Sequence, residues 1–222
     1  MATDIATPAR PTTQGDGLPE RLLEWAKVHR QTTTWVGTAV LVGAGLFLWT
    51  LSSTRRSEAI AGRQLQGALY AYENHNLPLA ASELARIVEN YSGTNAAAEG
   101  RLVLAQVRLL QGQPQQAVEL LQDFAPGAAA PFRAQAYGLL GAAYENLGRP
   151  RDAAEAYERG AERARLDFLK AQMLSDAGRT WAAAGDTAKA VAAYRRIVNE
   201  LPKQPAVAEA KVRLGELTKG TP

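Results

Sequence analysis

The side chains that could carry out chemistry in this sequence are few, and their spacing is that of a solvated helix face. Asp152, Glu155 and Glu158 recur at helical intervals, and paired carboxylates are what general acid–base catalysis requires. Arginines are interleaved with these carboxylates throughout residues 149–159. Opposite charges three or four residues apart on a helix form ion pairs in water, so the pattern favours a solvated surface over a catalytic pair.

Nucleophiles and metal ligands are also scarce. The chain has no cysteine and only two histidines, His29 and His75, which are far apart in sequence. Thiol catalysis and a metal site built on cysteines or several histidines are therefore excluded. The glycine-rich run VGAGLF at 42–47 lacks the Lys-Ser/Thr pair of a phosphate-binding loop. We predict that the protein is not an enzyme, with no catalytic, cofactor-binding or metal-binding residues and no cofactor.

The composition fits a folded protein with one or two domains. The 222 residues are 46% hydrophobic, which is enough to bury a core. Lys and Arg number 25 and Asp and Glu number 22, so the net charge is only +3. No basic stripe stands out, and we predict no binding to nucleic acid.

Residues 31–54 are the most distinctive segment, with 24 consecutive uncharged residues. As a helix this segment would be about 36 Å long, enough to cross a hydrocarbon core of about 30 Å. Trp35 and Trp49 lie near its ends, where indole rings favour the membrane interface. A buried core helix and a cleaved signal peptide are the alternatives, but the first would not lack charge for so long and the second would be shorter. We predict a single transmembrane helix, with weak self-association through small residues at Ala39 and Gly43.

The flanks of this segment do not determine its orientation. Three basic residues lie close to it on either side, so the positive-inside rule gives no preference. Residues 1–18 are rich in Thr, Pro and Gly, and we predict a disordered tail. Residues 19–30 mix apolar and charged side chains, which predicts an amphipathic helix on the membrane surface.

Residues 55–222 form the remaining predicted domain, whose pattern is helical and repetitive. Alanines recur at Ala80, Ala117, Ala153 and Ala190, spaced by 37, 36 and 37 residues. Each of these alanines follows a turn. The turns contain residues that end one helix, namely Gly112, Gly148 and Gly185. Pro78, Pro114 and Pro150 would begin the next helix, and Asp186 could cap the last one. The spacing predicts four helix–turn–helix repeats.

These repeats resemble the tetratricopeptide family, whose pattern is W-x2-L-G-x2-Y, then A-x3-F, then P. The segment 137–160, YGLLGAAYENLGRPRDAAEAYERG, matches this pattern, and the next repeat retains Gly178, Trp181, Ala190 and Tyr194. Small residues such as Gly141 and Gly178 would let paired helices approach closely, with Tyr157 and Tyr194 filling the space between them. The resemblance implies an all-α solenoid of about four repeats over 57–202, followed by a capping helix at 205–217.

The arrangement of the whole chain resembles the YfgM-type ancillary subunits of the bacterial Sec translocon, whose repeat domain is shared with the cell-division coordinator CpoB. The resemblance rests on a short tail, one glycine-rich span and degenerate repeats. It implies a span in the bacterial inner membrane, a cytoplasmic N-terminus and periplasmic repeats. The implied partners are Sec translocon subunits, periplasmic chaperones or exported polypeptides.

In the tetratricopeptide fold the first helix of each repeat lines a concave groove that binds partner segments. Mapping this arrangement onto the sequence gives apolar residues in the early repeats and polar ones in the late repeats, although some of the leucines could instead belong to the core. The predicted groove residues are Leu65, Leu69, Tyr72, Leu102, Gln106, Leu109, Gln135, Glu145, Asn146, Gln172 and Arg179.

Taken together, the sequence predicts an all-α, membrane-anchored protein–protein interaction scaffold. The role implied by the resemblance is an accessory factor of the Sec translocon that passes exported chains to folding factors. Two alternatives stay open: a cytoplasm-facing adaptor that recruits soluble complexes to the membrane, and a scaffold for cell-envelope or division assembly.

Overall fold

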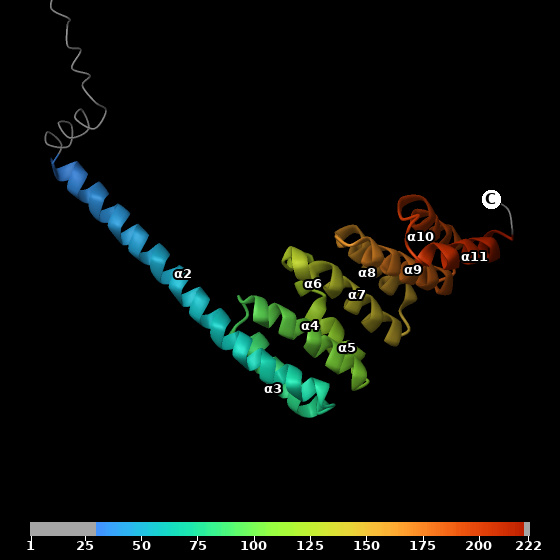
Figure 1. Ribbon diagram of the computed structural model, residues 1–222, viewed down its shortest axis with the longest axis horizontal. Helices are drawn as coiled ribbons and strands as arrows, with labels where there is room; N and C mark the ends of the chain where they lie inside the picture. Colours follow the sequence, from blue (N-terminus) through green and yellow to red (C-terminus); the bar gives the residue numbers. More distant parts are fainter. Residues whose placement is uncertain (1–29, 220–222) are drawn as a thin grey trace, which may run out of the picture. The chain divides into compact units, whose positions relative to one another are not determined.

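The computed structural model describes the backbone of residues 30–219, and these residues form helices joined by short turns, with no strand among them (Figure 1). The predicted tail at 1–18 and nearly all of the predicted surface helix at 19–30 lie outside the described residues. The helices are α2 (Arg30–Glu73), α3 (Leu77–Asn90), α4 (Asn95–Leu110), α5 (Pro114–Leu121), α6 (Phe124–Gly127), α7 (Ala130–Asn146), α8 (Pro150–Arg163), α9 (Asp167–Ala183), α10 (Thr187–Glu200) and α11 (Ala206–Thr218).

The chain divides into two units, Met1–Ser53 and Thr54–Pro222. In the first unit, the described part of α2 exposes large apolar side chains, namely Trp35, Val40, Leu41, Val42, Leu46, Phe47, Leu48 and Trp49. When only the described residues are considered, none of the helices combines the length and the apolar character needed to cross a membrane.

The second unit consists of the predicted helix–turn–helix repeats. The turns after α4, α7 and α9 each contain a glycine with positive φ, at Gly112, Gly148 and Gly185, as the spacing predicts. The first turn places His75 at the same position with φ 59°. The side chain of Asp186 accepts a hydrogen bond from the backbone N–H of Lys189 and caps α10, which confirms the predicted cap.

Within the late repeats, the small residue on one helix touches a tyrosine on its partner. A Cβ added to Gly141 would lie 2.7 Å from the ring of Tyr157, and a Cβ added to Gly178 would lie 2.7 Å from the ring of Tyr194. The corresponding positions in the early repeats hold an alanine and a leucine, Ala68 and Leu84 in one core cluster and Ala105 and Leu121 in the next, all buried. The predicted role of small residues in close helix packing is thereby confirmed for Gly141 and Gly178.

One part of the solenoid differs from the regular repeat. The helix α5 has 8 residues, whereas α3, α8 and α10 each have 14. The chain bends after Leu121, and the short helix α6 follows, anchored by the buried Ala125. Pro126 lacks a backbone N–H and cannot continue a long regular helix from α5, which accounts for the break.

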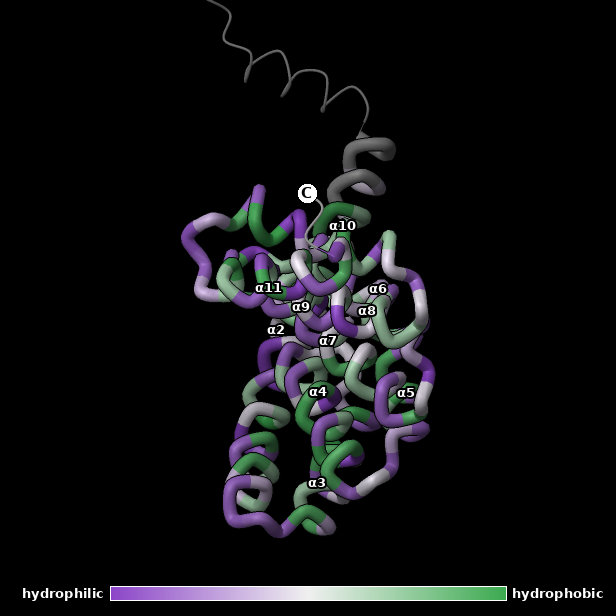
Figure 2. The backbone as a smooth tube through the Cα atoms, turned by 90° about the vertical axis from the view of Figure 1, so that its right-hand side faces the viewer, coloured by the Kyte–Doolittle hydropathy of each residue, from purple (hydrophilic) through white to green (hydrophobic). Residues whose placement is uncertain are grey.

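The two ends of the solenoid are closed differently. At the far end, α11 packs on α10 and α9 and occupies the segment predicted as the capping helix. In the first repeat, Gly67 occupies the position that Leu104, Leu140 and Ala177 fill in the later repeats, where each is buried against the repeat before it. The first repeat thus presents a polar and small face where a preceding repeat would need an apolar one. Along α3 and α4, in contrast to that face, hydrophobic and hydrophilic residues alternate, as is usual for helices that bury one side (Figure 2).

Candidate functional site

The face of the second unit formed by α7, α9 and α11 carries two adjoining hollows, which we call the distal groove. The first, of about 260 Å³, lies between α7 and α9 and is lined by Gln135, Leu139 and Gln172, among other residues. The second, of about 390 Å³, lies between α9 and α11. Both are lined by Gln172 and Asp176, so one elongated depression runs across three helices.

Four of the predicted groove residues come together at this place. Gln135 lines the first hollow, Gln172 lines both, and Arg179 lines the second. Glu145 comes from the end of α7 and contacts Arg179 directly. The structure therefore brings these four residues together, and their role in binding a partner stays a prediction.

An ion-pair network joins the helices that form the distal groove. The two terminal nitrogens of Arg179 donate to the two carboxylate oxygens of Glu145 at 2.6 and 2.9 Å, and one also donates to Asp176 at 3.1 Å. The hydroxyl of Tyr157 donates to Glu145 at 2.7 Å. Because Glu145, Tyr157 and Arg179 belong to α7, α8 and α9, this network holds the first helices of two neighbouring repeats at a defined spacing.

The two carboxylates that share Arg179 have opposite pKa shifts. Partial burial would raise the pKa of Glu145, but hydrogen bonds from Arg179 and Tyr157 outweigh it, and the pKa lies below its ordinary value. Burial dominates at Asp176 and raises its pKa, since the single hydrogen bond from Arg179 compensates only in part and the charges of Glu145 and Glu209 add to the increase. The charge of Arg179 is thus committed mainly to Glu145.

Two predicted groove residues belong to the core instead. Leu65 is 3% exposed and packs with α3 and α4, and Leu102 is 2% exposed and packs with α5 and α7. Neither can contact a partner. The apolar character that suggested a binding surface comes from the faces that these helices turn toward their neighbours.

The other predicted groove residues lie away from the two hollows. Leu69, Tyr72 and Leu109 are half-buried against the core of the first two repeats, whereas Gln106 and Asn146 are exposed. The side-chain amide of Asn146 donates to the carbonyl of Ala142 within its own helix. None of these five residues lines the distal groove.

Sequence reasoning missed several residues of the distal groove. Asp176 lies one helical turn before Arg179, Phe168 lies one turn before Gln172, and Glu209 comes from the capping helix. The stripe 168, 172, 175/176 and 179 on α9 follows the three- and four-residue spacing of a single helix face, a signal that could have indicated Phe168 and Asp176. The contribution of α11 depends on how the solenoid is capped and has no such local signal.

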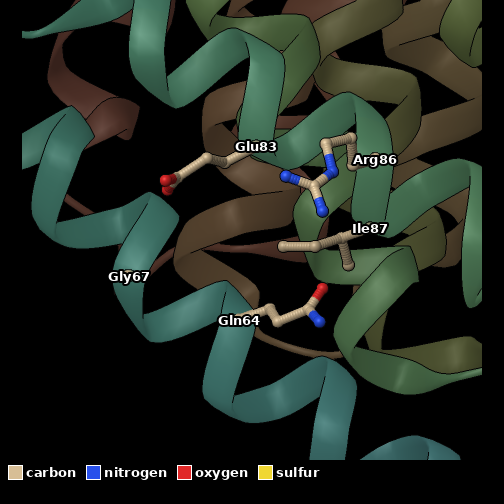
Figure 3. A pocket seen from close by; sticks show the side chains of 5 residues that line it. All are labelled: Gln64, Gly67, Glu83, Arg86 and Ile87. Carbon is tan, nitrogen blue, oxygen red and sulfur yellow. The ribbon is translucent and has the colours of Figure 1, made fainter.

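A further hollow, of about 270 Å³, lies in the first repeat between α2 and α3 (Figure 3). Gln64 and Gly67 face it from α2, and Glu83, Arg86 and Ile87 face it from α3. The amide of Gln64 also donates to the hydroxyl of Tyr91 at 3.3 Å. This hollow belongs to the polar face that ends the solenoid, and no predicted groove residue lines it.

Helix pairs of about 37 residues that share left-handed turns, with close glycine–tyrosine contacts in two of them, define an α-solenoid of tetratricopeptide type. Residues 50–175 match the family model described as a tetratricopeptide repeat-like domain, and residues 174–203 match one described as a tetratricopeptide repeat. The chain belongs to the tetratricopeptide repeat-like domain family.

Solved structures support the same fold. A Podosopora anserina protein described as a kinesin light chain with nearly identical TPR-like repeats is 20% identical, with a TM-score of 0.57 over 71% of this chain and 84% of its own. The crystal structure of MamA is 20% identical, with a TM-score of 0.56 over 69% of this chain and 83% of its own. At this identity the likeness concerns the fold alone. The sequence has no match among curated proteins.

Proposed function

We propose that the protein is a membrane-anchored scaffold that holds segments of partner proteins in the distal groove and catalyses no reaction. The observation that carries this proposal is the distal groove itself, an open depression that runs across the first helices of two repeats and the capping helix. Tetratricopeptide-type solenoids use such extended surfaces to bind other proteins. Polar groups that fix orientation and apolar groups that supply affinity are both present.

The anchor is proposed from the sequence. Residues 31–54 carry no charge, and this stretch includes Val36 and Leu51, whose side chains lie outside the described residues. The large apolar side chains that α2 exposes between Trp35 and Trp49 need a covering, and lipid would supply it. An anchored groove would work by raising the local concentration of its partner at the membrane.

The cellular role is proposed from the resemblance to YfgM-type subunits. In this proposal the span lies in a bacterial inner membrane, the N-terminus is cytoplasmic and the repeats are periplasmic. The partners are Sec translocon subunits, periplasmic chaperones and exported polypeptides. The repeats would hold an emerging chain beside its exit site until folding factors take it over.

Site-specific photo-crosslinking in cells tests this function. A photoreactive amino acid at Gln172, which is exposed and shared by the two hollows, is expected to crosslink to translocon subunits, chaperones or exported chains. The matched control carries the same amino acid at Glu155, exposed on α8 and not part of the distal groove. Identical adducts at both positions, or adducts at Glu155 alone, would overturn the groove as the binding surface.

A further inference from the structure

We propose that the distal groove selects partner segments that present a lysine or arginine next to apolar residues. This inference rests on the proposed function, because it names the chemistry of the segment that the groove would hold. Its physical basis is an excess of carboxylates at the junction of the two hollows together with apolar side chains on both sides.

The ion pairs around the junction contain more carboxylates than cations, and Asp176 is left without a cation of its own. Arg179 makes two hydrogen bonds to Glu145 and only one to Asp176. Asp176 lines both hollows, and Glu209 lines the second. Glu209 shares Arg213 with Glu216, which lies closer to that guanidinium, at 3.0 Å compared with 3.9 Å.

These ion pairs therefore join four carboxylates to only two guanidinium groups. Asp176 stays within range of the charges of Glu145 and Glu209, both of which oppose its ionisation. A cationic side chain that entered between the two hollows would meet Asp176 and Glu209 and relieve this repulsion. A partner carboxylate at the same place would add to the repulsion, so an acidic segment is disfavoured.

The apolar part of the distal groove flanks this negative centre. Phe168 is 59% exposed at the edge of the second hollow, which is unusual for a large aromatic side chain. Leu139, Leu169 and Met173 line the first hollow. A lysine or arginine over Asp176 would lay its aliphatic stem along these side chains, and apolar neighbours would contact Phe168 on one side and Leu139 on the other.

Fluorescence anisotropy with labelled peptides tests the proposal. The probes are a short fluorescein-labelled peptide that alternates lysine with leucine, a second with glutamate in place of lysine, and a third with serine there. The full-length chain is used in mild detergent, with protein-free micelles as the blank. We expect the lysine peptide to bind about tenfold more tightly than the serine peptide and the glutamate peptide to bind most weakly.

Variants locate the effect. Asp176→Asn and Glu209→Gln should each weaken binding of the lysine peptide by about three- to tenfold, whereas Glu155→Gln on α8 should leave it unchanged. The side chain of Glu209 is exposed, so its variant tests the proposal even if Asp176→Asn disturbs the fold.

Equal binding of the lysine and serine peptides, unaffected by both variants, would overturn the charge selectivity while leaving the groove as a binding surface. Stronger binding of the glutamate peptide would overturn it as well. Failure of every peptide to bind would count against the proposed function as well as the inference.

Discussion

Gly178 on α9 lies directly against the ring of Tyr194 on α10, so close that a Cβ on the glycine would stand 2.7 Å from a ring carbon. The same contact occurs one repeat earlier between Gly141 and Tyr157. In the first two repeats alanine stands in place of the glycine and leucine in place of the tyrosine, and both are buried. The four helix pairs therefore pack with either of two combinations of side chains, glycine with tyrosine or alanine with leucine.

This contact predicts that Gly178→Ala destabilises the repeat domain. The added methyl would have to displace the ring of Tyr194, which is buried, and overpacking of this kind costs about 1–3 kcal/mol even after the gain in helix propensity. Gly215 in α11 is the matched control, because it lies 37 residues later and a Cβ there meets nothing within 4 Å. Urea unfolding monitored by circular dichroism should show a loss for Gly178→Ala and no loss for Gly215→Ala.

The turn at His75 predicts a stabilising substitution. A histidine with φ 59° occupies the position where the other repeats have glycine, and a non-glycine residue in this region costs about 1–2 kcal/mol. We expect His75→Gly to raise the free energy of unfolding by about 0.5–1 kcal/mol, since the added flexibility of the unfolded chain offsets part of the gain. Gly148→Ala should have the opposite effect. Unfolding midpoints that move the same way in both variants would contradict this account.

The start of α4 predicts a third stability effect. The carboxylate of Glu58 accepts hydrogen bonds from the backbone N–H groups of Asn95 and Ala96 at 2.8 and 2.9 Å, and so satisfies donors at the N-terminus of a neighbouring helix. Glu58→Ala should cost about 1–2 kcal/mol. Glu99→Ala, an exposed position later in α4, serves as the control and should be close to neutral. Thermal unfolding of both variants beside the wild type measures the difference.

The ion-pair network predicts how acid affects stability. The pKa of Glu145 lies below its ordinary value of 4.5, so the folded state favours the ionised form. Its contribution is fully present above pH 4.5 and is lost as the pH falls through the lowered pKa of the folded state. Melting temperatures should therefore decrease below that pH, and they should decrease less in Glu145→Gln.

Asp176 supplies the comparison of opposite sign. Its pKa is raised, so its ionisation costs stability as the pH rises through its ordinary value toward the raised one. Asp176→Asn should therefore melt no lower than the wild type at neutral pH. If acid lowered the melting temperature equally in Glu145→Gln and in the wild type, groups other than Glu145 would be the cause.

The proposed topology predicts the accessibility of single cysteines. The natural chain has none, so Thr221→Cys introduces a unique thiol. A membrane-impermeant maleimide applied to cells with a permeable outer barrier should label it, whereas a thiol introduced by Ala2→Cys should react only after lysis. The reverse pattern would place the repeats in the cytoplasm and favour the adaptor alternative.

The repeat architecture could be predicted because it depends on local signals. Glycines at 112, 148 and 185 and prolines at 78, 114 and 150 identify the turns without knowledge of tertiary contacts. The separation of core from groove could not be predicted in the same way. Leu65 and Leu102 lie on helices that contact neighbours on more than one side, so an apolar residue does not reveal which side it faces.

The candidate site was predictable on α7 and α9 but not on α11. Gln172 and Arg179 follow from their place on the first helix of a repeat, whereas Glu209 reaches the distal groove only because the capping helix packs beside α9. Pairings across helices, such as that of Arg179 with Glu145 over 34 residues of sequence, depend on the stacking distance between repeats. The break after α5 was not predicted, although Pro126 followed by Gly127 is a dipeptide that marks turns.

The small and polar face at Gly67 sets a direction for how this domain could grow. A new repeat inserted between existing ones would have apolar neighbours on both sides, because Leu104, Leu140 and Ala177 are already buried between successive repeats. A new repeat added ahead of the first would meet Gln64, Gly67 and Glu83 and gain little by stacking. In evolution or by design, insertion of a repeat within the array is therefore favoured over addition of a repeat before the first one.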